Sequence, residues 1–160
     1  MSKPAALPLL DEHVVRTFAH PAQVWEVLPA GIAAVFDHPR GRALAGLLGC
    51  RERRAGKSFT AVEGATIPGF RVVRIVAQRE IALEGRHRFA RYLLTFRVEP
   101  RDGGTTLRAA TRAEFLGVHG ALYRALVVGS GGHRVVTRRI LNSIARRAER
   151  ASIRHRKEGT

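Results

Sequence analysis

One histidine lies in a stretch whose alternation would aim it at an apolar interior. The apolar Ile81, Leu83 and Phe89 share parity with His87, and the charged residues between them share the other parity. This period of two is typical of a half-buried strand, so we expect the imidazole on the buried face. There it could exchange one hydrogen bond with an oxygen of a ligand. The alternative is a core histidine satisfied by a backbone carbonyl or a water.

Two tyrosines offer related chemistry. Tyr92 and Tyr123 each combine an apolar ring with a hydroxyl that needs a partner when buried. Together with apolar residues at inward positions they form a predicted pocket lining: Trp25, Phe70, Leu83, His87, Phe89, Tyr92, Leu94, Phe96, Phe115, Tyr123 and Leu126. Because ligand pockets are mostly apolar with few polar groups, the same residues could instead fill a solid core.

The sequence lacks the motifs of common catalytic and cofactor sites. It contains no Gly-x-Ser-x-Gly, no phosphate-binding loop ending in Lys-Ser/Thr and no His-Glu-x-x-His. The seven histidines show no close metal spacing, and the single cysteine, Cys50, allows no intramolecular disulfide. Asp37 and His38 are adjacent, but neighbouring residues on a helix point in different directions, which argues against a relay. We therefore predict no catalytic residue, no metal site and no cofactor.

The charge is strongly positive. The net charge is +15, and all but three of the 28 basic residues are arginine. A nucleic-acid or anionic-membrane partner would select a basic face, whereas a GC-rich genome would raise arginine throughout the chain. Arginines occupy the predicted outward strand positions (Arg86, Arg88, Arg97, Arg108 and Arg112) and the terminal helix (Arg138, Arg139, Arg146, Arg147, Arg150, Arg154 and Arg156). Glu84 and Glu114 could pair with some of the strand arginines. Few aromatic residues are interleaved with these arginines, so the only route we expect for nucleic acid is the Arg-rich helix.

Strand patterns dominate the middle of the chain. Predicted strands cover 13–19, 70–76, 81–89, 92–98 and 107–115, with a weaker pattern over 58–66. Pro68-Gly69 is a turn signal, and Asp102-Gly103 is a strong hairpin signal.

Helical patterns flank these strands. Pro21 suits the first turn of a helix over 22–28, which Pro29 would end. A second helical region is expected within 31–48, interrupted near His38-Pro39. Beyond Gly117 a stripe of apolar residues predicts a helix that runs to about Arg150: Leu122, Leu126, Val136, Ile140 and Ile144. The glycine-rich run 129–132 indicates either a break between two helices or a close approach to the sheet or a ligand.

The length of 160 residues suits one domain. We expect a flexible start over 1–10, a domain over 11–150 and a basic flexible tail over 151–160. The chain has neither a secretory signal pattern nor a membrane-spanning stretch, so we expect a soluble cytoplasmic protein.

The predicted order is a strand, two short helices, five or six antiparallel strands and a long terminal helix. It resembles the helix-grip fold of the SRPBCC superfamily, which includes START lipid-transfer domains, plant pathogenesis-related proteins and polyketide cyclases. Several segments look like bacterial members: HPAQVWEVL (20–28), TIPGFRVVRIV (66–76), REIALEGRHRFARYLLTFRVEP (79–100) and FLGVHGALYRALVVGSGGH (115–133). The resemblance implies an α+β domain whose curved antiparallel sheet, of about six or seven strands, wraps around the terminal helix and encloses an apolar cavity. It implies no single chemistry.

Three functions follow as hypotheses. The first is non-catalytic binding or transfer of a hydrophobic or amphipathic small molecule, such as a lipid, polyketide or aromatic metabolite, by a monomer or homodimer. The second is a cyclase, aromatase or dehydratase in which His87 acts as general acid or base. The third is a basic module that binds nucleic acid or anionic lipid.

Overall fold

The computed structural model describes residues 7–36, 38–39, 50 and 61–158. Its centre is one antiparallel sheet in the order β1-β6-β5-β4-β3-β2, in agreement with the predicted α+β class. The strands are β1 (Leu9–Thr17), β2 (Thr66–Ile67), β3 (Phe70–Val76), β4 (Glu80–Arg86), β5 (Ala90–Arg101) and β6 (Gly104–Phe115). The weak strand predicted over 58–66 begins with residues outside the described part of the chain, and from 61 onward only Thr66 belongs to a strand.

The period-two pattern separates the two faces of the sheet as predicted. Leu83 on β4 pairs with Leu94 on β5, and Leu94 pairs with Thr111 on β6. All three side chains are buried, whereas the intervening positions of β6 are half-buried or exposed. One face of the sheet therefore carries the core, and the other carries most of the charged strand residues.

Both predicted turns are present. Gly103 has a φ of 71° in the β5–β6 hairpin, and Gly69 has a φ of 87° between β2 and β3. Glycine adopts these left-handed values without the steric cost that a side chain would bring. The two turns therefore help to set which residues face the core, because a slip of one residue would reverse every side chain.

Helix α1 (Pro21–Phe36) is continuous, so the prediction that Pro29 ends the first helix is wrong. A proline inside a helix removes one hydrogen bond and costs about 3 kcal/mol. Burial offsets this cost, because Leu28 and Ile32 are fully buried. Gly31 adds close contact with the terminal helix, since a Cβ there would lie 2.5 Å from Cγ1 of Ile144. Residues 40–48 of the second predicted helical region lie outside the described residues.

The C-terminal region forms two helices, α3 (Gly117–Val127) and α4 (Gly132–Glu158), so the glycine-rich run marks a break. The predicted apolar stripe is consequently buried only at its last two residues. Ile140 and Ile144 on α4 are buried, whereas Leu122 and Leu126 on α3 are exposed. Helix α4 also continues past the expected end near Arg150, through residues that we predicted as a tail.

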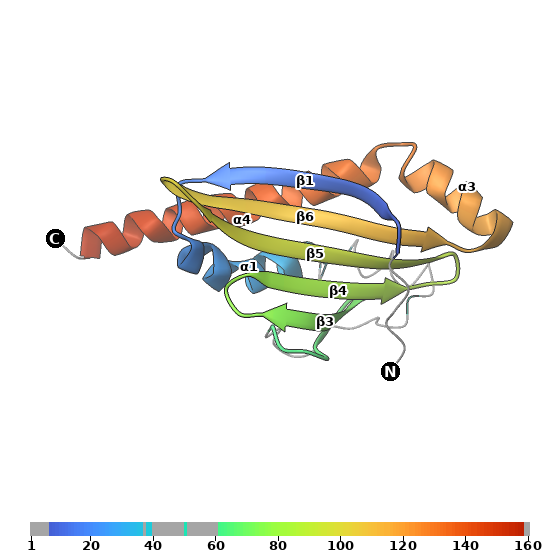
Figure 1. Ribbon diagram of the computed structural model, residues 1–160, viewed down its shortest axis with the longest axis horizontal. Coiled ribbons are helices and arrows are strands. Elements are labelled where there is room, and N and C mark those ends of the chain that lie inside the picture. Colours follow the sequence, from blue (N-terminus) through green and yellow to red (C-terminus); the bar gives the residue numbers. More distant parts are fainter. Residues whose placement is uncertain (1–6, 37, 40–49, 51–60, 159–160) are drawn as a thin grey trace.

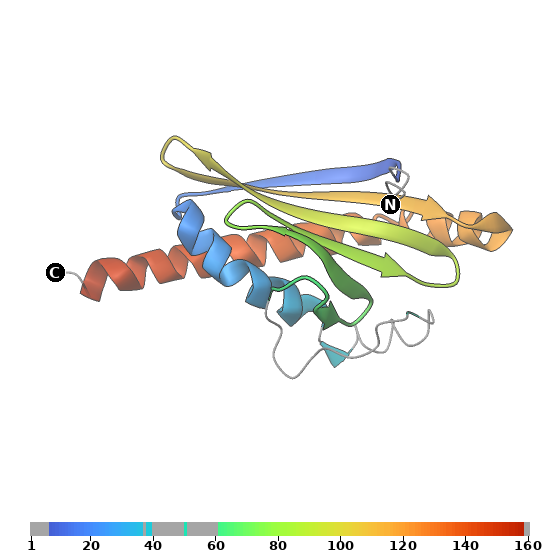
Figure 2. The same ribbon diagram turned by 60° about the horizontal axis from the view of Figure 1, so that its bottom comes forward.

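Helices α1 and α4 lie on the same face of the sheet, and α4 runs along most of its length (Figure 1 and Figure 2). Helix α3 lies at one end of the molecule, beyond the end of β6. The core fills the space between the sheet, α1 and α4, and its largest fully buried side chains include Phe96, Leu107 and Leu141. None of the described helices combines the length and the hydropathy that a membrane span requires.

Candidate functional site

His87 lies in the short connection between β4 and β5, directly beside α3. Its side chain is buried, with 5% of the residue surface exposed. Nδ1 accepts a hydrogen bond from the backbone N–H of Phe89 at 3.1 Å. Nε2 is buried and has no hydrogen-bond partner among the described residues. The predicted inward direction of His87 is therefore confirmed, but the described part of the chain satisfies only one of its two ring nitrogens.

The protonation state of His87 follows from these contacts. Burial lowers the pKa of the imidazole, because the charged form loses its hydration. A neutral imidazole whose Nδ1 accepts a hydrogen bond carries its proton on Nε2. His87 thus presents a buried N–H donor for which the described residues supply no acceptor. Such a donor typically costs about 1–3 kcal/mol, and a ligand oxygen would recover that cost.

Aromatic rings surround the imidazole. The ring centroids of Tyr123 on α3 and Tyr92 on β5 lie 4.7 Å and 5.5 Å from that of His87. Phe89 lies 6.0 Å from both His87 and Tyr123, and Phe115 lies 6.4 Å from Tyr123. The surroundings of the free donor are therefore flat, apolar and polarisable, as in sites that hold aromatic or other unsaturated molecules.

Tyr92 connects this cluster to the far edge of the sheet. Its hydroxyl donates to the carbonyl oxygen of Gly69 at 3.3 Å and lies 3.9 Å from Sγ of Cys50. Its ring lies against Gly85 on β4, where a Cβ would collide with it. Burial, and secondarily Cys50, raises the pKa of Tyr123, so this phenol stays protonated. Tyr123 is therefore a neutral group, and the cluster suits an uncharged ligand.

A second polar cluster lies under the start of α4, and our sequence reasoning missed it. The Asp11 carboxylate lies between two imidazoles, 3.3 Å from Nε2 of His13 and 3.3 Å from Nε2 of His133. Nε2 of His133 is also 3.1 Å from the Thr111 hydroxyl. The only local signal was the Asp-x-His spacing, which puts both side chains on one face of a strand. His133 joins them through the tertiary fold, and no spacing rule predicts that.

The remaining predicted lining residues are dispersed. Phe70 belongs with the cluster, since its ring lies 5.1 Å from that of Tyr92. Leu83, Leu94 and Phe96 are buried in the main core, and Trp25 packs against that core from α1. Leu126 is 65% exposed on α3. The structure thus brings six of the predicted residues to one end of the sheet: Phe70, His87, Phe89, Tyr92, Phe115 and Tyr123.

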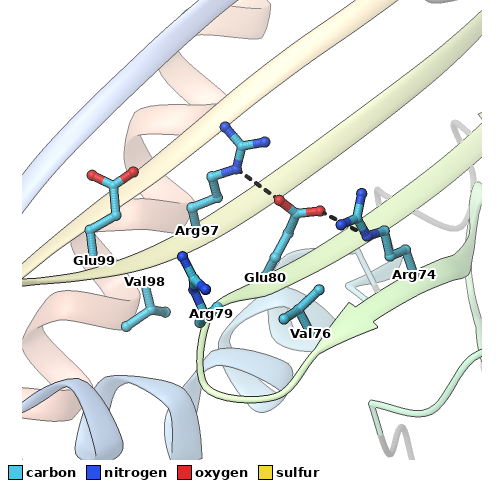
Figure 3. A pocket seen from close by; sticks show the side chains of 7 residues that line it. All are labelled: Arg74, Val76, Arg79, Glu80, Arg97, Val98 and Glu99. Atoms are coloured by element: carbon cyan, nitrogen blue, oxygen red, sulfur yellow. Dashed lines mark hydrogen bonds and ion pairs between the residues drawn. The ribbon is translucent and has the colours of Figure 1, made fainter.

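The outer face of the sheet holds paired charges. A hollow of about 380 Å³ is lined by Arg74, Val76, Arg79, Glu80, Arg97, Val98 and Glu99 (Figure 3). Within it, Arg97 Nε donates to Glu80 at 2.8 Å, and Arg74 Nε lies 3.5 Å from the other carboxylate oxygen. Glu84 pairs with Arg91 at 3.6 Å, and not with an arginine of the predicted set. Ion pairs therefore neutralise part of this basic face.

A wider groove of about 880 Å³ lies between α1 and α4. It is lined by Glu26, Val27, Ala30, Ser143, Arg146, Arg147, Arg150, Ile153 and Arg154. Four of the arginines predicted on the terminal helix thus gather in one depression. Their spacing along α4 places them on neighbouring turns, where like charges repel one another.

No protein-family model matches this chain, and no curated protein matches it. Solved structures share its fold. A protein from Rhodobacter sphaeroides is 18% identical with a TM-score of 0.53, over 89% of this chain and 93% of the other. An uncharacterised protein from Rhizobium leguminosarum is 18% identical with a TM-score of 0.51, over 88% and 95%. CalU16 from Micromonospora echinospora is 14% identical with a TM-score of 0.51, over 91% and 90%. At these identities the likeness establishes the fold alone.

Proposed function

We propose that the chain is a helix-grip protein of the SRPBCC type that binds an uncharged, amphipathic small molecule at the α3 end of the sheet. The observation that carries the proposal is the buried Nε2–H of His87, which has no acceptor among the described residues. A ligand oxygen placed against Nε2 would satisfy this donor, and the rings of Tyr92, Tyr123 and Phe89 would contact its apolar part.

The chemistry of the cluster favours a carbonyl or ether oxygen over a carboxylate. His87 is neutral because burial lowers its pKa, so it supplies a hydrogen bond without a positive charge. An anion buried there would lose its hydration without gaining a counter-charge from the imidazole. Affinity would come mainly from apolar contact, and orientation would come from the single hydrogen bond.

Two matched probes test the proposal: 2-acetylnaphthalene, which has a carbonyl acceptor, and 2-ethylnaphthalene, which has none. We expect the wild type to bind the ketone, and His87→Phe to weaken ketone binding about tenfold more than it weakens ethyl binding. Comparing the two proteins with the same probe cancels the hydration of that probe, and comparing the two probes cancels the change in packing that the substitution causes. Equilibrium dialysis gives all four affinities.

His119→Phe is the matched control. His119 lies on α3, and its side chain is exposed. Its ring centroid is 6.4 Å from that of Phe89, so it borders the same cluster. This substitution should leave the ratio of the two affinities unchanged. A wild type that binds neither probe, or a His87→Phe variant with the wild-type ratio, would contradict the proposal.

The second polar cluster gives specific support to an alternative, a cyclase- or dehydratase-type enzyme. An imidazole held by a carboxylate is an arrangement suited to general base catalysis, and here Asp11 hydrogen-bonds to His13 and lies 3.3 Å from His133. Such a base would remove a proton from the methyl group of 2-acetylnaphthalene held beside the Asp11 cluster, and D₂O would return a deuteron. The enzyme would be favoured if the ketone takes up deuterium faster with the wild type than in buffer alone, and if this excess disappears with the Asp11→Asn variant. Uptake at the buffer rate would favour simple binding.

A further inference from the structure

Helix α3 carries a stripe of apolar side chains directed at solvent. Val118, Leu122 and Leu126 are spaced four residues apart, which places them on one face of the helix. They are 85%, 63% and 65% exposed, respectively. Soluble proteins normally bury large aliphatic side chains, and a grouped set of exposed ones marks an interaction surface.

The opposite face of α3 is fixed to the sheet, so the stripe cannot simply turn inward. A Cβ on Gly120 would lie 2.8 Å from the carbonyl oxygen of Phe89, which shows how closely the helix approaches the β4–β5 connection. Tyr123 on the same face contacts His87. Helix α3 therefore lies with Gly120 and Tyr123 against the sheet and with its aliphatic face outward.

Positive charge surrounds this end of the molecule. Exposed arginines lie in the β4–β5 connection, on α3 and on the first turns of α4: Arg88, Arg124, Arg134, Arg138 and Arg139. Among the described residues, none of them has a carboxylate within ion-pair distance. Arg124 instead lies over the ring of Phe115, 5.9 Å from its centroid. The apolar stripe thus has a basic border.

We infer that α3 docks on the surface of an anionic lipid bilayer, with Val118, Leu122 and Leu126 inserted at the headgroup boundary and the arginines on the phosphates. An exposed aliphatic face bordered by cations is the pattern of helices that lie in the plane of a membrane interface. Charge complementarity selects this occupant over a second copy of the chain, because two copies with a net charge of +15 each repel one another. Docking would also bring the cover of the His87 cluster to the lipid surface, although the inference does not depend on a ligand there.

Vesicle co-sedimentation tests this inference with phosphatidylcholine vesicles and with vesicles that also contain about 30% phosphatidylglycerol. We expect the wild type to bind the anionic vesicles, and to lose that binding as salt rises. Leu122→Gln/Leu126→Gln should weaken it at least about tenfold, because the aliphatic face can no longer insert. Glutamine preserves helix propensity, and circular dichroism checks the fold.

Ile153→Gln is the matched control for the single variant Leu122→Gln. Ile153 is also an exposed aliphatic residue among arginines, 57% exposed, but it lies on the C-terminal half of α4. The Ile153→Gln variant should bind anionic vesicles with an affinity within about twofold of that of the wild type. The Leu122→Gln variant should bind them more weakly than that. Equal losses in the two variants, or no wild-type binding to anionic vesicles, would overturn the inference. A wild-type dimer that the double variant dissociates, with unchanged vesicle binding, would overturn it too.

Discussion

The two ends of the molecule are built in different ways. Where α1 crosses α4, Gly31 allows the two helices to meet at Ile144. Farther along α4, the Thr17 hydroxyl of β1 donates a hydrogen bond to the Glu149 carboxylate at 2.7 Å, so the Thr17 hydroxyl has a partner. At the α3 end, His87 keeps a buried donor that has no partner in the described part of the chain, and Leu122 is exposed. The first end is packed as a stable core requires. The second end has a buried donor that the described residues leave unpaired and an aliphatic side chain that is exposed. Departures of this kind from normal packing commonly mark functional sites.

The largest predicted effect separates the two ends by stability. Ile144→Ala should destabilise the fold by about 2–5 kcal/mol, because it opens a cavity between α1 and α4. Leu122→Ala should change stability by no more than about 0.5 kcal/mol, because its side chain is already exposed. Urea denaturation followed by circular dichroism measures both. Similar losses at the two positions would mean that α3 is part of the cooperative core.

A smaller effect tests the helix crossing itself. Gly31→Ala raises helix propensity, yet it should cost about 1–3 kcal/mol, because its Cβ would overlap Ile144. The double variant Gly31→Ala/Ile144→Val should recover part of the loss. A Gly31→Ala protein that melts at a higher temperature than the wild type would show that the helices are farther apart than described.

His87 should contribute to the pH dependence of stability with a definite sign. Burial lowers its folded-state pKa below the usual 6.5. The unfolded chain therefore binds a proton more readily, and the wild type should lose stability as pH falls below about 6.5. His87→Phe should lack this component, and at neutral pH it should differ from the wild type by only about 1 kcal/mol, since one hydrogen bond to Phe89 is lost as the unpaired donor is removed. Denaturation at a series of pH values compares the two proteins; parallel curves would count against a buried neutral imidazole.

The smallest effect belongs to the outer face of the sheet. Glu80→Gln should cost less than about 1 kcal/mol, because its partners Arg97 and Arg74 are more than half exposed and water can solvate them. The difference from the wild type should shrink in about 0.5 M salt. Denaturation at low and high salt checks this. A large, salt-independent loss would indicate that the ion pair is structural.

The sequence predicted the strands and turns well because their signals are local. Alternation over 81–98 and 107–115 sets the faces, and Gly69 and Gly103 mark the turns. The helices were harder. Pro29 is a strong local signal for a helix end, but the burial of α1 side chains such as Leu28 and Ile32 outweighs it. The stripe that joined Leu122 to Ile140 assumed a straight helix, whereas the chain breaks between α3 and α4.

The part of the candidate site that lies on strands could be predicted, because strand periodicity is a local signal. The parity of His87 and Tyr92 follows from strand periodicity, so their inward direction could be derived. The unpaired state of Nε2 among the described residues could not be derived from the sequence. It depends on the geometry of the β4–β5 connection, where the backbone N–H of Phe89 donates to Nδ1. The Asp11–His133 contact joins the first strand to the last helix, and only the folded chain brings these two residues together.

The most direct test of the account is the proton on His87. Long-range ¹H–¹⁵N correlation spectra of ¹⁵N-histidine-labelled protein, with His87→Phe to assign the signal, report the tautomer of each imidazole. We predict a neutral ring at pH 7 with its proton on Nε2, whose resonance shifts when 2-acetylnaphthalene is added and does not shift with 2-ethylnaphthalene. A charged ring, a proton on Nδ1, or the same response to both probes would contradict a donor waiting for a ligand oxygen.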